Sequence, residues 1–324
     1  MVGRYKLEIN GLKVKYKIAI ERQITIIKGD SGTGKSTLWK VVSEALKGSK
    51  GYSSNMIEKI YTLDELSPWE MLIKTLKNKI IFIDENSRYV YSSDFAEVAQ
   101  RSDNYFVIIS RRSLDNMVYS YKSIYELKTN KNNGICETEL IYKFRDNIGN
   151  NTVNNHNMVI CEDRKSGYQM MKLIIDNSHL ETASGKDNIA IKIGSNRDKI
   201  YYVIADGAGF GNCIESIVAL FNEGVRMTLL LDESFEKMIL DYPVFYNMCK
   251  KKLDETFMFC DTKLFKSYER YYTYLLNEIC KKLYNKQYSK SRLISELKQN
   301  DIVAFICNKL LYINKELLLN NKGE

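Results

Sequence analysis

Proline and histidine are scarce in this sequence of 324 residues, with 2 of each. The two histidines, His156 and His179, leave little material for a histidine-based site, so any catalysis is expected to use carboxylates, lysine and metal. The 7 cysteines form no CxxC pair and no Cys/His spacing typical of zinc. This excludes the common zinc folds and predicts reduced, mostly buried thiols, as in a cytosolic protein.

Long apolar runs are also missing. No run approaches the roughly 20 apolar residues that span a bilayer, and the N-terminus MVGRYKLEING has no apolar signal core. We therefore expect a cytoplasmic protein with no membrane partner. A hydrophobic fraction of 44% supports real cores, and the length suits two domains.

The net charge of +8 is unevenly placed, because residues 250–324 hold 15 basic against 9 acidic residues. A basic end of this kind binds nucleic acid in some proteins and is a solvated helical face in others.

Residues 1–148 are expected to form one α/β domain. Strands are predicted over residues 6–10 and 12–20, on either side of Asn10-Gly11, a dipeptide typical of a type I′ hairpin turn. A third strand, residues 23–29, runs directly into the stretch GDSGTGKST, which is followed by the helical pattern STLWKVVSEALKG.

This stretch contains a complete GxxxxGK[ST] motif between a strand and a helix. The glycines let backbone amides surround a β-phosphate, and the helix N-terminus adds partial positive charge. Lys35 is expected to reach the β- and γ-phosphates of ATP, and Ser36 to bind Mg²⁺. The predicted nucleotide-binding residues are Gly29, Asp30, Ser31, Gly32, Thr33, Gly34, Lys35, Ser36 and Thr37.

A second motif, KIIFIDEN, occupies residues 79–86. Ile80 to Ile83 predict a buried parallel strand, with Asp84 at its carboxyl end as a Mg²⁺ ligand. Glu85 is expected to polarise the attacking water, which favours hydrolysis of ATP over transfer to a small molecule. Ser67-Pro68-Trp69-Glu70 predicts a capping box at the start of the preceding helix.

A further strand is expected over residues 105–110, ending in Ser110-Arg111-Arg112. These residues suit either a γ-phosphate sensor or a solvated loop. The segments SIYELKTN and ICETELIYKF then predict a closing hairpin.

GDSGTGKST together with IIFIDE resembles the additional-strand, catalytic-glutamate class of P-loop ATPases, and the opening strands make residues 1–145 similar to its ABC/SMC/RecF branch. The resemblance implies ATP and Mg²⁺ as cofactors and a homodimer or a partner protein. The sequence contains no LSGGQ-like segment, which is the part that closes the ABC dimer.

A second α/β domain is expected over residues 157–245, after an Asn/Gly-rich linker at 146–157. Its strands end in acids: Glu162 and Asp163, then Asp206, then Asp232 and Glu233. Because parallel strands share one carboxyl edge, these acids are predicted to converge. Clustered carboxylates repel one another unless a cation such as Mg²⁺ or Mn²⁺ neutralises them.

The stretch YYVIADGAGFG, residues 201–211, allows three interpretations. Asp206 suits a metal site, the glycines suit a phosphate cradle, and the whole suits an ordinary strand-to-helix corner. Asn212 stands where a dinucleotide GxGxxG motif needs its last glycine, which disfavours the phosphate cradle.

ICED and ADGAGFG resemble the TOPRIM domain of topoisomerases, primases and OLD-family nucleases. The resemblance implies that Glu162 and Asp206 hold a metal for phosphodiester cleavage, and Ala208 replaces the second aspartate of that motif. The metal ligands implied for the chain are thus Ser36, Asp84, Glu162 and Asp206, and the catalytic residues are Lys35, Glu85, Glu162 and Asp206.

Residues 246–324 are expected to be a basic helical region. Its segment 266–292 mixes tyrosines with basic residues, which suits nucleic-acid binding or, as we favour, an amphipathic bundle with half-buried tyrosines. The expected function is an ATPase that controls a TOPRIM-like nuclease acting on nucleic acid, in genome maintenance or phage defence. The alternative is an ATP-dependent switch with a non-catalytic docking domain.

Overall fold

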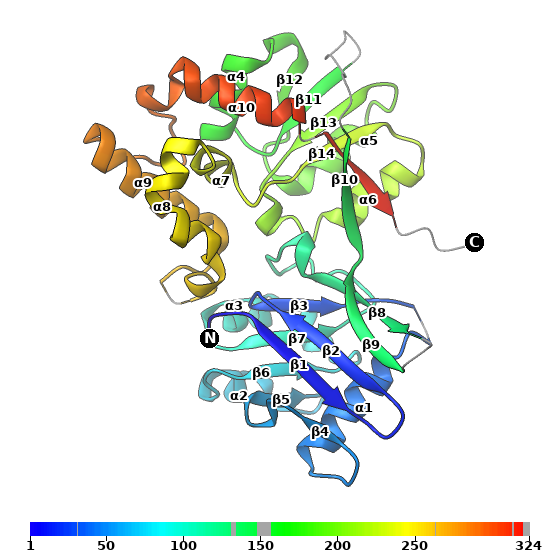
Figure 1. Cartoon of the computed structure of the whole chain (residues 1–324). Helices are drawn as coiled ribbons and strands as arrows, with labels where there is room; N and C mark the ends of the chain where they lie inside the picture. The colour runs from blue at the N-terminus through cyan, green and yellow to red at the C-terminus, as the bar shows by residue number, and fades with distance from the viewer. Residues whose placement is uncertain (31, 131–133, 148–156, 263, 313, 320–324) are drawn as a thin grey trace. The chain divides into compact units, whose positions relative to one another are not determined.

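The chain is an α/β protein with one large mixed sheet, one parallel sheet and surrounding helices (Figure 1). The computed structural model describes residues 1–30, 32–130, 134–147, 157–262, 264–312 and 314–319. It divides into two compact units: unit 1 is 1–141 with 256–266, and unit 2 is 142–255 with 267–324. Among the described residues, no helix is long and apolar enough to cross a membrane.

Unit 1 contains a nine-stranded sheet in the order β4-β1-β2-β9-β8-β3-β7-β6-β5. β8, β3, β7, β6 and β5 run parallel to one another, while β1 and β2 form an antiparallel pair at the other side. Every residue of β3, β6 and β7 is buried, as expected for central parallel strands with both faces covered. The strands are β1 (Tyr5–Asn10), β2 (Lys15–Ile20), β3 (Ile24–Ile27), β4 (Ser53–Ser54), β5 (Ile60–Leu63), β6 (Ile80–Ile83), β7 (Tyr105–Ile109), β8 (Ile124–Asn130) and β9 (Ile135–Leu140).

The helices of unit 1 are α1 (Lys35–Leu46), α2 (Trp69–Thr75) and α3 (Ser93–Arg101). α1 buries Leu38, Val41, Val42 and Ala45, which lie on one helical face, and so packs against the sheet core. The predicted closing hairpin is confirmed, because β8 and β9 pair antiparallel.

The predicted two-residue turn at Asn10-Gly11 is wrong. β1 pairs with β2 from Asn10 opposite Lys15, so four residues connect the strands, and Gly11 has no positive φ. Gly11 is needed for a different reason: a Cβ there would come within 2.9 Å of Val41 Cγ2. The glycine therefore allows the turn to lie close against α1.

The predicted capping box at the start of α2 is also wrong. Pro68 is the N-cap, and no side chain caps the helix. The hydroxyl of Ser67 instead donates to Asp64 Oδ1 at 2.8 Å and accepts from the Asp64 amide at 3.0 Å. A local turn has taken the serine that the helix would have used.

Unit 2 contains a four-stranded parallel sheet in the order β12-β11-β13-β14. Its strands are β11 (Asn157–Cys161), β12 (Leu180–Thr182), β13 (Ile200–Ile204) and β14 (Met227–Leu230), and the helices α4 (Ser166–Ile174), α5 (Ile189–Gly194) and α6 (Ile214–Asn222) connect them. After β11 the chain forms β12 on one side of β11, and it then crosses to form β13 on the other side. The strand order therefore reverses between β11 and β13. Ligands of open α/β sheets bind at such a switch point.

The C-terminal part adds α7 (Phe235–Leu240), α8 (Pro243–Asp254), α9 (Tyr268–Tyr284) and α10 (Asn300–Tyr312). α10 lies beside α4, although the two helices are far apart in the sequence (Figure 1). The chain also forms a strand that the sequence analysis did not predict: β15 (Asn314–Leu319) pairs antiparallel with β10 (Tyr142–Asn147).

The division of the chain differs from the three domains expected. The break falls between residues 141 and 142, and most of the expected linker, residues 148–156, lies outside the described residues. The region 246–324 does not stand alone, since residues 256–266 belong to unit 1. There the Gly3 amide donates to the Phe257 carbonyl at 3.0 Å, and the Gln23 amide to Asp261 Oδ2 at 2.8 Å.

Candidate functional site

The glycine-rich loop of unit 1 joins the end of β3 to the start of α1. Gly29, Gly32 and Gly34 have φ angles of 149°, 84° and 89°. A side chain is strained in this region, so these positions need glycine for the chain to curl over the N-terminus of α1. Of the other expected nucleotide-binding residues, Asp30, Ser36 and Thr37 are exposed, and Ser31 lies outside the described residues.

The ammonium group of Lys35 lies inside this loop. The residue is only 3% exposed. Its Nζ donates to the carbonyl oxygens of Gly29 at 2.5 Å and Asp30 at 2.7 Å, and to Thr33 Oγ1 at 3.2 Å. The loop therefore holds a cation at its centre, where the motif places the phosphates.

Asp84 and Glu85 follow directly after β6, as predicted. One strand, β7, lies between β6 and the strand β3 that leads into the loop. Burial lowers the pKa of Lys35, whereas the negative charge of Glu85 raises it. Glu85 and the loop lysine therefore interact electrostatically, although 50 positions separate them.

The two arginines after β7 differ in their contacts. Arg111 forms an ion pair with Glu85 through Nε and Oε1, and the Glu85 side chain is 15% exposed. Arg112 lies over the ring of Tyr91, with its Cζ 4.4 Å from the ring centroid. Ser110 is buried and shares a hydrogen bond of 2.9 Å with the Tyr91 hydroxyl. Arg111 is thus the arginine that reaches the acid pair.

Tyr16 is a residue of this site that the sequence analysis missed. It is buried in β2, and its hydroxyl donates to the Gly34 carbonyl at 3.1 Å. The only indication in the sequence was that Tyr16 occupies an inward-facing position in a strand whose side chains alternate between the two faces of the sheet.

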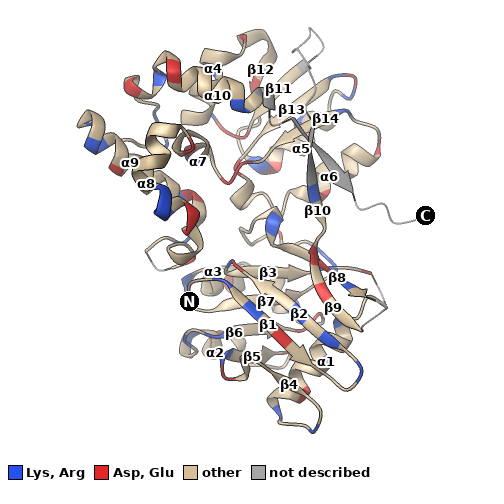
Figure 2. Cartoon of the chain, viewed as in Figure 1, with Lys and Arg blue, Asp and Glu red and all other residues tan. Residues whose placement is uncertain are grey.

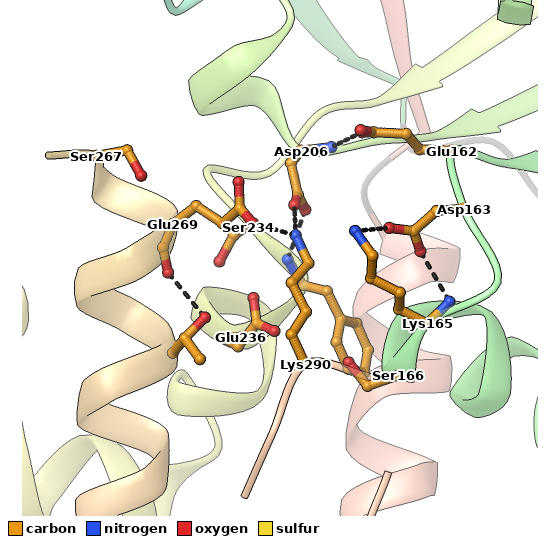
Figure 3. Close-up of polar contacts among 12 residues, drawn as sticks. Glu162, Asp163, Lys165, Ser166, Asp206, Ser234, Glu236, Ser267, Glu269 and Lys290 are labelled. Atoms are coloured by element: carbon orange, nitrogen blue, oxygen red, sulfur yellow. Dashed lines mark hydrogen bonds and ion pairs between the residues drawn. The ribbon is translucent and has the colours of Figure 1, made fainter. Parts of the chain in front are cut away.

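The acidic edge of unit 2 is the set Glu162, Asp206, Asp232, Glu236 and Glu269, which lie at or near the carboxyl ends of β11, β13 and β14 or on the adjoining helices. Figure 3 labels all of them except Asp232. The predicted convergence of the first two is confirmed, because the Asp206 amide donates to Glu162 Oε2 at 3.1 Å. They meet where the strand order reverses.

Both carboxylate oxygens of Asp206 accept hydrogen bonds from protein groups. Its Oδ1 accepts from the Phe235 amide at 3.0 Å, at the start of α7, and its Oδ2 accepts from Lys290 Nζ at 2.6 Å. Lys290 also forms an ion pair with Glu269 on α9 (Figure 3). Lys290 and Glu269 were not predicted as site residues.

The other acids of this region also have partners. Asp232 Oδ2 accepts from Lys309 Nζ at 2.9 Å, and Lys309 forms a second ion pair with Asp241. Asp163 is paired with Lys165 at 2.8 Å. Two lysines, Lys290 and Lys309, thus reach the sheet edge although they lie far from these acids in the sequence. Both come from the basic C-terminal region.

Glu236 is a buried acid that the sequence analysis missed. It is 0% exposed; its Oε1 accepts from the Tyr288 hydroxyl at 2.8 Å, and its Oε2 has no hydrogen-bond partner among the described residues. The Tyr288 hydroxyl also shares a 2.8 Å hydrogen bond with Ser166 Oγ. Burial, reinforced by the charge of Asp206, raises the pKa of Glu236 to about 7.

Burial likewise raises the pKa of Glu162 to about 7, again with a contribution from Asp206. A cavity of about 40 Å³ lies between these groups, lined by Glu162, Asp206, Asp232, Lys290 and others. This volume holds a few water molecules at most and is too small for a nucleotide.

The glycines of ADGAGFG do not form a phosphate cradle. Residues Gly207–Gly209 make a short 3-10 turn, and none of the three glycines has a positive φ. The amides of Gly207, Ala208 and Gly209 already donate to the carbonyls of Asp232, Glu233 and Asp206. Backbone donors that are used within the protein cannot surround a phosphate.

A divalent metal does not fit the acidic edge as it is arranged. Both carboxylate oxygens of Asp206 have protein donors, and the described residues contain no group of three or more His, Cys, Asp or Glu side chains that could hold a metal ion. Mg²⁺ needs several oxygen ligands at about 2.0–2.1 Å, which this arrangement does not offer.

The tyrosines of segment 266–292 support the amphipathic interpretation. Tyr268, Tyr271, Tyr272 and Tyr288 are buried and cannot stack on bases, whereas Tyr274 is exposed. Acidic and basic residues are interspersed along α9, whereas α8 carries three consecutive lysines followed by Asp254 (Figure 2).

No model of a known protein family matches this sequence, and no curated protein matches it. Function is therefore inferred from the residues and contacts of the two units themselves.

Proposed function

We propose that unit 1 binds and hydrolyses ATP as a P-loop NTPase of the additional-strand, catalytic-glutamate class. The observation that carries this proposal is the buried ammonium of Lys35 inside a loop of positive-φ glycines. The strand order supports it, because β7 is the additional strand between β3 and β6.

Each residue has a role that its position supports. Lys35 would contact the β- and γ-phosphates, with the N-terminus of the 12-residue helix α1 behind them. Glu85 would orient the water that attacks the γ-phosphate. Arg111, now paired with Glu85, is placed to neutralise charge on the phosphates.

The residues also fit a magnesium ion. Ser36 offers an exposed hydroxyl, and Asp84 offers a carboxylate of which Oδ2, among the residues that the structure describes, accepts only from Asn86, at 3.1 Å. These are the hard oxygen ligands that Mg²⁺ takes beside a nucleotide. The ion would supply charge neutralisation between the phosphates.

The test compares Glu85→Gln, Lys35→Ala and the wild type for nucleotide binding and for phosphate release. Glu85→Gln should keep ATP binding and lose roughly 10²-fold or more in hydrolysis, because it removes only the group that handles water. Lys35→Ala should weaken binding by roughly tenfold or more, since it removes charged hydrogen bonds.

Glu97→Gln changes an exposed residue of α3 that forms an ion pair with Arg101; it is the matched control and should behave as the wild type. Hydrolysis that survives Glu85→Gln, or no binding of ATP by the wild type, would reject the proposal.

For unit 2 we propose a TOPRIM-like module that responds to the nucleotide state of unit 1 and acts through a partner, in genome maintenance or phage defence. The lysines on Asp206 and Asp232 favour this non-catalytic role. The contact of Glu162 with Asp206 at the switch point favours the second candidate, a metal-dependent nuclease acting on DNA or RNA.

An incubation with plasmid, single-stranded DNA and bulk tRNA, with Mg²⁺ or Mn²⁺ and with or without ATP, separates the two candidates. We expect no cleavage beyond that of Glu162→Gln. Cleavage by the wild type that Glu162→Gln abolishes would instead establish the nuclease.

A further inference from the structure

Lys290 is held firmly in place at the acidic edge. It lies after the end of α9, and its carbonyl accepts from the Ser166 amide at 3.0 Å. Gln169 of α4 bonds to the same segment on both sides: its Nε2 donates to the Ser291 carbonyl at 3.0 Å, and its Oε1 accepts from the Leu293 amide at 3.0 Å. The backbone that carries Lys290 is therefore fixed to α4.

The side chain of Lys290 lies among carboxylates (Figure 3). It is 21% exposed and bonds to both Asp206 and Glu269. Burial lowers its pKa, but the charges of Asp206, Glu269 and Glu236 outweigh burial and raise it. The ammonium thus stays charged through the physiological pH range.

This cation contacts the carboxylate oxygen that a metal would need. A metal ion bound to Asp206 would have to share Oδ2 with the Lys290 ammonium or Oδ1 with the Phe235 amide, or displace one of these donors. Whether Lys290 shares Oδ2 or leaves it, its positive charge stays within a few ångströms of the metal, which is unfavourable in a partly buried site.

A second lysine repeats the arrangement. Lys309 is 16% exposed and bonds to Asp232 and Asp241. Asp232 follows β14 at the same edge of the sheet. Both aspartates that could have completed a metal site are therefore neutralised from the C-terminal region.

We propose that the ammonium groups of Lys290 and Lys309 are the resident cations of the acidic edge, and that this edge binds no divalent metal in the native protein. The C-terminal region is then an integral part of the edge, which it neutralises. This inference does not depend on ATP hydrolysis in unit 1.

The test is a Mn²⁺ titration of the full chain without nucleotide, followed by the electron paramagnetic resonance of free Mn²⁺, in an Asp84→Asn background that removes the ligand of unit 1. Without Lys290 the carboxylates face one another unneutralised. Lys290→Met should therefore gain a Mn²⁺ site, roughly tenfold tighter than any site in the parent, and Mn²⁺ should raise its Tm.

Two further variants act as controls. Lys290→Arg keeps the positive charge and should bind no more Mn²⁺ than the parent, and Asp206→Asn added to Lys290→Met should remove the gained site. A folded Lys290→Met that gains no site would overturn the proposal.

The parent protein gives an independent answer should Lys290→Met fail to fold. Mn²⁺ binding by the parent that Asp206→Asn abolishes would show a metal at this edge and reject the resident lysine. Equal Mn²⁺ binding in the parent and in Asp206→Asn would support it.

Discussion

Glu236 is a residue whose ionisation should affect stability. Its carboxyl is fully buried, faces the hydroxyl of Tyr288 and feels the charges of Asp206 and Lys290. Its pKa is raised from 4.5 in the unfolded chain to about 7 in the folded protein. The folded state therefore holds this proton more tightly than the unfolded state does.

The sign of the pH dependence follows from this difference. Below about pH 4.5 Glu236 is protonated in both the folded and the unfolded state, so its ionisation does not change the free energy of unfolding. As the pH rises from there through about 7, the unfolded state loses its proton more readily, so the free energy of unfolding falls. Above that range Glu236 is ionised in both states, and the free energy of unfolding falls no further on its account.

Glu236→Gln should therefore raise stability at pH 8 by about 1–3 kcal/mol and change it little near pH 4.5, because the amide keeps an acceptor for Tyr288 and removes the buried charge. Urea unfolding at both pH values measures this. The control is Glu223→Gln, whose exposed pair with Arg197 contributes little. An equal change at both pH values would contradict the ionisation argument.

At the scale of single elements, α7 is short and depends on its N-terminal cap. Ser234 is buried, and its hydroxyl accepts from the Lys237 amide at 3.2 Å. The amide of Phe235, the residue after Ser234, donates to Asp206. These two acceptors satisfy donors that a helix start leaves free, and they tie α7 to the sheet edge.

Ser234→Ala should lower the free energy of unfolding by about 1 kcal/mol, because a buried helix start loses its acceptor. Thermal unfolding followed by circular dichroism measures the effect. Ser295→Ala, at an exposed serine whose hydroxyl donates to its neighbour Glu296, should fall within about 0.5 kcal/mol of the wild type. Equal effects of the two changes would mean that the cap is not important.

Elements defined by contiguous residues were predictable from the sequence. Ile80 to Ile83 form β6 as expected, because a run of buried apolar residues leaves few alternatives. The glycine loop and Asp84-Glu85 were found for the same reason: each is a short, continuous pattern next to a strand.

Contacts between distant residues were not predictable. Nothing near Lys290 indicates that it pairs with Asp206, 84 positions away, and the same holds for Lys309 and Asp232. The incorrect turn at Gly11 has a related cause, because the side chain of Val41, 30 positions away, leaves no room for a Cβ there. The incorrect cap at Ser67 has a local cause instead: a turn with Asp64, three positions earlier, uses the same hydroxyl.

At the scale of the whole molecule, unit 1 is discontinuous in the sequence. Residues 256–266 return to it after most of unit 2 has been made. They supply acceptors for the amides of Gly3 and Gln23, a ring for Arg4 and the buried side chain of Cys260. The unit is incomplete without them.

A fragment of residues 1–141 should be less stable than the same fragment joined to residues 256–266 by a flexible linker. We expect a difference of about 2–4 kcal/mol, from the hydrogen bonds that Phe257 and Asp261 accept from two backbone amides and from the buried side chains of the segment. The midpoints of urea unfolding of the two fragments give the comparison. Identical midpoints would show that the segment adds nothing to the fold.

The same discontinuity affects how the chain emerges from the ribosome. The strands of the large sheet are complete at residue 140, but their last supporting segment ends at residue 266, about 125 residues later. At about 5–20 residues per second, the nascent sheet waits on the order of 6–25 s for that segment. During this time the backbone amide of Gln23, next to the central strand β3, lacks its native acceptor. Slower translation between these two points would lengthen the interval in which the newly made half is open to aggregation or chaperone binding.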